Sequence, residues 1–128
     1  MEEVIQVGDI DLDMLREAWQ KRAEEKQHKK RMLQKDAMEK AKQAASFIKK
    51  SYGASKIYLY GSLAWSHHFD AHSDIDLLVE GFTQPDRYWQ MLCDVWKIVS
   101  PFPPSVVLAE DACPSLLEKV QKQGVELL

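Results

Sequence analysis

Residues 58–81 read YLYGSLAWSHHFDAHSDIDLLVEG, and this stretch decides the fold prediction. The apolar run at 56–60 (KIYLY) is typical of a buried strand, and Gly61 and Ser62 predict a sharp turn into a short helical stretch. A polar loop follows, and residues 74–80 (DIDLLVE) predict a second strand. The segment therefore predicts two strands joined by a turn, a short helix and a loop.

Two aspartates at the start of the second predicted strand share one face of the sheet. Side chains alternate along a strand, so Asp74 and Asp76 project together. Paired carboxylates suit hard divalent cations such as Mg²⁺, and two metal ions held close together are the usual device for in-line phosphoryl displacement. Gly61 lets a phosphate approach the backbone and Ser62 offers a hydroxyl, so the turn and the acid pair are complementary.

The remainder of the chain predicts helices and one more strand. Residues 14–50 contain neither Gly nor Pro and predict one long helix. Residues 86–99 and 114–123 predict two further helices, and 105–109 predicts a third strand. This order indicates an α/β (α+β) fold in which helices cover a small mixed sheet. The predicted core includes Leu33, Ala37, Ala41, Ala44, Ala45, Ile48, Tyr58, Tyr60, Tyr88, Trp89, Leu92, Val95, Trp96 and Val99.

We expect the chain to have two parts. Residues 1–50 form an acidic segment followed by a long basic helix, and residues 51–128 form the core. Residues 21–50 hold eleven Lys or Arg and four Asp or Glu, so this part carries +7 and, with a net charge of -3, the remainder carries -10. A helix of about 55 Å overhangs a compact domain of this size. A partner or a second copy then covers its far apolar patch, and the alternative is a break near 24–31 that makes a helical hairpin. The patch consists of Leu12, Leu15, Ala18 and Trp19.

Composition limits the class of protein. A chain of 128 residues with 45% hydrophobic and 29% charged residues suits one domain with a real core. No apolar run approaches the roughly 18 residues of a membrane span, and the acidic N-terminus is unlike a secretory signal, so we expect a cytoplasmic protein that makes no membrane contact. Cys93 and Cys113 lack metal-site spacing and are expected to be free thiols.

The combination of Gly-Ser, a loop of about ten residues and Asp-x-Asp on the next strand is more specific than either part alone. In these features the chain resembles the minimal nucleotidyltransferase (MNT) family of the DNA polymerase β-like superfamily. The resemblance runs from about Lys49 to the C-terminus. It implies a polymerase β-like nucleotidyltransferase fold and the transfer of a nucleoside monophosphate, commonly AMP from ATP, to a hydroxyl group with release of pyrophosphate.

The resemblance also implies roles for individual residues and a partner. Gly61, Ser62 and Ser73 would bind the nucleotide, and Asp74 and Asp76 would be the catalytic carboxylates that bind two magnesium ions. Proteins of this kind and size are similar to the antitoxins of HEPN/MNT toxin-antitoxin pairs. In these pairs the MNT protein binds a HEPN ribonuclease toxin and can adenylylate a tyrosine on it. Such a partner would also account for the overhanging helix.

Three departures from the family pattern bear on catalysis. Alignment with the family ending places Ser105 where a third carboxylate is usual, and rescue by Glu110 or Asp111 needs a shifted strand register. Trp65 and Ser66 replace a common Arg-Gly, which removes a cation that could meet phosphate. Eleven residues, one more than usual, separate the Gly-Ser pair from the first aspartate, which a loop can absorb.

These observations leave alternatives for the function. The first hypothesis is an active AMP transferase, and the second is a binding module that neutralises its partner by occlusion. The basic helix could instead hold RNA, although its Lys and Arg residues lack interleaved aromatic residues. His67, His68 and His72 crowd the loop before the acid pair and could touch phosphate or a metal, although such loop histidines are more often solvent-exposed.

Overall fold

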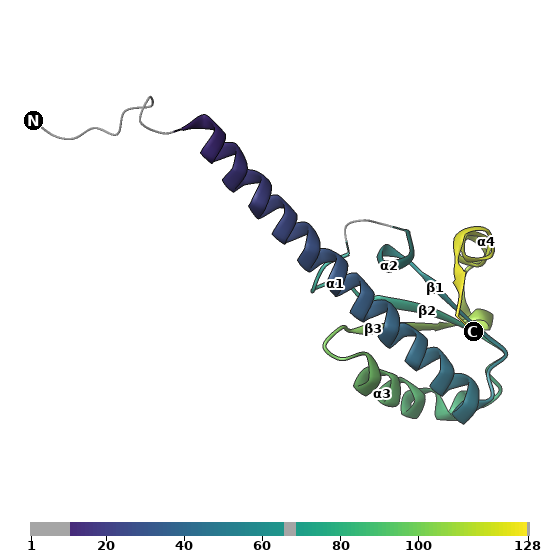
Figure 1. The fold of residues 1–128 in the computed structure, drawn as a ribbon. Helices are drawn as coiled ribbons and strands as arrows, with labels where there is room; N and C mark the ends of the chain where they lie inside the picture. Colours follow the sequence, from purple (N-terminus) through teal and green to yellow (C-terminus); the bar gives the residue numbers. More distant parts are fainter. Residues whose placement is uncertain (1–10, 66–68, 128) are drawn as a thin grey trace, which may run out of the picture. The chain divides into compact units, whose positions relative to one another are not determined.

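The computed structural model describes residues 11–65 and 69–127, which form helices around one small sheet (Figure 1). This confirms the mixed α+β class and the long N-terminal helix. The chain divides into two compact units, one that ends at Met32 and one that starts at Leu33. The elements are α1 (Leu12–Tyr52), β1 (Lys56–Tyr60), α2 (Ser62–Trp65), β2 (Ile75–Glu80), the 3₁₀ turn η2 (Pro85–Arg87), α3 (Tyr88–Val99), β3 (Pro104–Leu108), the 3₁₀ turn η3 (Ala109–Asp111), α4 (Pro114–Gln123) and β4 (Val125–Glu126).

The sheet has the strand order β3-β2-β1-β4 and is mixed. β1 pairs antiparallel with β2 and with β4, and β2 pairs parallel with β3, a connection that needs the crossover made by α3. In this register Tyr60 lies opposite Asp76, and Asp76 lies opposite Ser105. These three residues therefore form a row across three strands on one face of the sheet.

The main core lies on the other face of the sheet, where the second half of α1 and one side of α3 pack. Alanines on α1 are fully buried, and their small side chains let the helix lie close to the strands. Gly53 has a left-handed φ of 71°, and its N–H donates to Lys49 O at 3.1 Å, which ends the helix as a C-terminal glycine does. The cluster includes Ala37, Ala41, Ala44, Ala45, Ile48, Ile57, Leu59, Ile75, Leu77, Val79, Met91, Val95 and Val99.

The predicted inward face of α3 is wrong in two positions. Trp89 and Trp96 were expected in the core, but 73% of Trp89 and 51% of Trp96 is exposed. The helix turns Val95 and Val99 inward, as predicted, together with Met91, so the buried residues follow one another at steps of four. Both faces of this short helix carry apolar residues, so periodicity alone could not choose between them.

Other elements follow the sequence prediction closely. β1 has the predicted bounds, β2 and β3 begin within one residue of theirs, and α1 is continuous through residues 24–31, where a break was the alternative. The short strand β4 was not predicted, because two residues give no periodic signal. Within residues 11–65 and 69–127, no helix has both the length and the apolarity to cross a membrane.

Candidate functional site

The turn between β1 and α2 is built around Gly61. This residue has a φ of 79°, a left-handed conformation that favours glycine. Its carbonyl accepts hydrogen bonds from the N–H groups of Ala64 at 3.1 Å and Trp65 at 2.9 Å, which fix the turn into α2. A Cβ atom at this position would overlap the carboxylate of Asp76. The Asp76 side chain therefore lies directly against the glycine turn.

The electrostatics of Asp76 show that the two acids lie close enough to interact. Partial burial, with added repulsion from Asp74, raises the pKa of Asp76 from 3.8 to about 6. Asp76 is half-buried within β2, whereas Asp74 is exposed immediately before the strand. A carboxylate pair that repels itself in this way is stabilised by a bound cation, and its oxygen donors are those that Mg²⁺ prefers. The donor set therefore fits magnesium.

The row of Tyr60, Asp76 and Ser105 defines the side of the site toward β3. Burial raises the pKa of Tyr60, the charge of Asp76 raises it further, and a hydrogen bond with Ser105 opposes both. Ser105 lies beside Asp76 in the register, so the slot predicted for a third carboxylate holds a hydroxyl. Across the described parts of the chain, no group of three or more His, Cys, Asp or Glu residues could hold a metal ion.

The two acids that could have replaced Ser105 do not join this row. Glu110 and Asp111 lie in η3, after the end of β3. Both line a separate cavity together with Tyr88 of α3. The shifted register that would bring either acid beside Asp76 is not present, because β3 and β2 pair in register from Ile75 with Pro104.

The loop before Asp74 contains a turn that is held by side-chain hydrogen bonds. The carboxylate of Asp70 accepts from the N–H of His72 at 2.8 Å and from the hydroxyl of Ser73 at 3.2 Å, while Ser73 Oγ accepts from the N–H of Asp70 at 3.0 Å. The bond from His72 is the main reason that the pKa of Asp70 is lowered. Ser73, predicted to bind nucleotide, has its hydroxyl engaged in this turn. The turn positions the chain directly before Asp74.

Sequence reasoning missed a cation near the site and the role of Trp65. The indole N–H of Trp65 donates to Gln123 O at 2.6 Å, and its ring lies 6.1 Å from the ring of Tyr60. The ammonium of Lys119 on α4 lies 4.7 Å from the centre of the Trp65 ring. A lysine therefore stands beside Trp65. No local signal links positions 54 residues apart, although strand alternation could have placed Tyr60 in the row with Asp76.

The remaining residues named in the sequence analysis are Ser62, Ser66 and the three loop histidines. Ser62 opens α2 directly after Gly61, the residue against which Asp76 lies. His72 is exposed in the Asp70 turn. His67 and His68 lie outside the described residues, as does Ser66.

Comparison with known proteins adds no assignment. No protein-family model matches the chain, and no curated protein matches it in sequence.

Proposed function

We propose that this chain is a magnesium-dependent nucleotidyltransferase of the MNT type, with a polymerase β-like fold, that transfers AMP from ATP to a hydroxyl group. The observation that carries the proposal is the contact of the Asp76 carboxylate with Gly61, with Asp74 close enough to repel it. A metal-binding acid pair and a turn open to phosphate are the two parts that nucleotide transfer needs, and here they touch.

The roles of the residues follow from their chemistry. Asp74 and Asp76 would hold the magnesium ions, which when bound offset the charge of the triphosphate and of the pyrophosphate leaving group. Gly61 leaves its backbone open to a phosphate oxygen because it has no side chain. Ser62 donates its hydroxyl to the same group, and Lys119 adds positive charge on the α4 side.

We further propose that the acceptor is a tyrosine of a HEPN ribonuclease toxin, which makes this protein the antitoxin of the pair. This part of the proposal rests on the family resemblance alone. The four-stranded mixed sheet, with the glycine turn after β1 and the acid pair at the start of β2, is compatible with it.

A second candidate function is a nucleotide-binding module that neutralises the same partner by occlusion. The hydroxyl of Ser105 beside Asp76 favours it, because a serine cannot take the proton of the attacking hydroxyl as a carboxylate does. General base catalysis contributes roughly 100-fold to 10,000-fold, so its loss leaves a slow enzyme or none. Nucleotide binding needs only the acid pair and the turn.

The decisive experiment combines binding and transfer. Calorimetry measures ATP uptake with and without magnesium, and α-labelled ATP with a HEPN partner measures transfer. We expect Asp74→Asn to abolish both, whereas the control Glu80→Gln, an exposed acid on the same strand and face, retains both. Neutralisation without any label transfer would favour the binding module. An absence of magnesium-dependent uptake of any nucleotide would refute both functions.

A further inference from the structure

The outer side of α3 carries an exposed aromatic stripe. Trp89 and Trp96 are seven residues apart, so they lie on the same side of the helix two turns apart, and Cys93 is exposed between them. We call these three residues the α3 stripe. Large exposed aromatic side chains gathered in this way are typical of protein interfaces, where tryptophan is among the residues that contribute most to binding.

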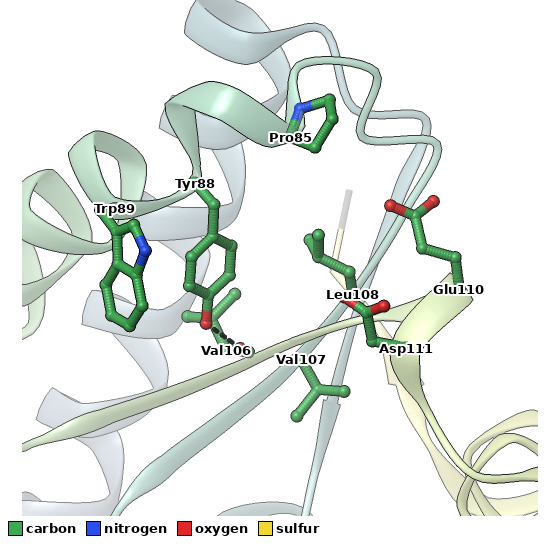
Figure 2. Close-up of a pocket in the computed structure, with 8 residues that line it drawn as sticks. All are labelled: Pro85, Tyr88, Trp89, Val106, Val107, Leu108, Glu110 and Asp111. Carbon is green, nitrogen blue, oxygen red and sulfur yellow. Dashed lines mark hydrogen bonds between the residues drawn. The ribbon is translucent and has the colours of Figure 1, made fainter.

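A cleft adjoins the Trp89 end of the α3 stripe (Figure 2). Its volume is about 430 Å³. Tyr88 and Trp89 form one wall, with their rings 5.2 Å apart at 83°, and the Tyr88 hydroxyl donates to Val106 O at 2.7 Å, which holds its ring upright over the edge strand. Glu110 and Asp111 stand on the opposite side. Aromatic faces opposite two carboxylates favour a basic side chain, which binds both kinds of group.

The first unit of the chain carries the complementary pattern. Leu12, Leu15 and Trp19 are exposed at helical spacing, and the distance from Leu12 to Trp19 is the same seven residues as in the α3 stripe. Three basic residues continue the same side of the helix at steps of three and four. We call the six residues the α1 stripe, and they are Leu12, Leu15, Trp19, Arg22, Lys26 and Lys29.

We propose that the α1 stripe of one copy docks on the α3 stripe and the adjoining cleft of a second copy, so that the protein forms a dimer. The apolar half of one stripe covers the exposed tryptophans of the other, and its basic half enters the acidic cleft. The stripe carries the cations Arg22, Lys26 and Lys29 and the cleft carries Glu110 and Asp111, so the two surfaces have opposite charge. The proposal is independent of the nucleotidyltransferase function.

Charge selects an antiparallel arrangement of the two helices. With Trp19 beside Trp89, Arg22 lies about 4.5 Å further along and reaches the cleft of Glu110 and Asp111. The opposite end then brings Asp13 near Lys97, which is again a pair of opposite charges. A parallel arrangement would instead place Asp13 at the acidic cleft.

The antiparallel register makes a specific prediction about neighbours. Trp19 lies beside Trp89 and Leu12 beside Trp96, so Leu15 faces Cys93. A twofold dimer repeats this contact twice, because each copy offers one α1 stripe and one α3 stripe. Two such helix contacts bury more surface than one, so their total comes closer to the buried area of a standard protein interface.

The first test measures the mass of the full chain by sedimentation over a concentration series. We expect a dimer whose dissociation constant rises about 10-fold or more with Trp89→Ala or Trp19→Ala. Met14→Ala, an exposed apolar change on a different side of α1, is the matched control and leaves the dimer intact. A monomer at every concentration, or an equal loss of the dimer in the control, would overturn the proposal.

The second test uses charge reversal. Arg22→Glu and Asp111→Lys should each weaken the dimer about 10-fold, and the double variant should restore it because the attraction returns with its signs exchanged. Additive weakening in the double variant would contradict the placement of Arg22 in the cleft.

The third test is a disulfide between copies. In a Cys113→Ser background, Leu15→Cys should form a bond with the native Cys93 under mild oxidation and run at twice the monomer mass. Glu17→Cys, on the opposite side of α1, is the control and should not. A bond formed within a single chain would show that α1 docks on its own copy, and a bond formed equally by the control would show that the contact is nonspecific. Either result overturns the proposal.

Discussion

Replacement of Asp76 by asparagine should make the metal-free protein more stable and at the same time abolish magnesium-dependent nucleotide binding. The charged form of Asp76 is destabilised in the folded protein, because burial and the neighbouring Asp74 raise its pKa from 3.8 to about 6. At neutral pH Asp76 is therefore charged in the folded protein, although its surroundings favour the protonated form. Asparagine keeps the shape of the side chain and removes the charge.

The size of the effect follows from the pKa shift. About 1.4 kcal/mol per pKa unit gives an upper limit of about 3 kcal/mol. Asp76 is only half-buried, so solvent screening reduces this to about 1 to 1.5 kcal/mol. For a chain of this size the melting temperature of Asp76→Asn should rise by about 4 to 6 °C at pH 7.5 without magnesium.

The sign of the pH dependence provides an internal control. A carboxyl group with a raised folded-state pKa adds stability that is complete below its unfolded pKa of 3.8 and is lost as the pH rises through about 6. The difference between variant and wild type should therefore shrink as the pH falls from 7.5 to 4.5. Parallel thermal melts of the two proteins measure this difference and cancel the titration of all other groups.

The same melts test the proposed magnesium site. Magnesium with ATP should raise the melting temperature of the wild-type protein and leave that of Asp76→Asn unchanged, because ligands stabilise only the state that binds them. The reasoning would be refuted if the variant were less stable than the wild type at pH 7.5, or if it gained stability from magnesium and ATP equally.

Three further predictions concern single residues in the candidate site and in the core. Gly53→Ala should lower the free energy of unfolding by about 1 to 2 kcal/mol, the cost of an alanine in the left-handed conformation, because the space around Gly53 is open. Gly61→Ala should lower it by more, because φ is similar and the added methyl group overlaps Asp76. Denaturant melts of the two variants compare these losses. Ser105→Asp should raise AMP transfer about 100-fold by restoring a base beside Asp76, measured with labelled ATP, and an unchanged rate would exclude this role. Tyr52→Phe should lose about 1 kcal/mol, since its hydroxyl donates to Asp94 at 2.9 Å, and equal melting curves would contradict this.

Much of the site was predictable because its signals are local. Gly61 and Ser62 punctuate an apolar run, and alternation along a strand places Asp74 and Asp76 on one side, so four residues within 16 positions define the acid pair and the turn. The contact of Asp76 with Gly61 also follows from the antiparallel pairing of the two strands that flank the loop.

The residues that sequence reasoning missed depend on contacts between distant elements. Lys119 reaches Trp65 only because α4 returns to β1, and no periodicity in either segment records this. The exposure of Trp89 and Trp96 was missed for a related reason, since hydrophobicity ranks tryptophan with core residues whether it faces a core or an interface.

The two faces of β2 lie in different surroundings. Ile75 and Leu77 point into the packed interior with α3, whereas Asp76 points to the opposite surface. A molecule that covers the outer side of α3 therefore leaves the carboxylates free to meet small solutes. The proposed dimer and the proposed nucleotide chemistry can in this way be altered by separate substitutions, and a variant library sorted for one property should leave the other largely untouched.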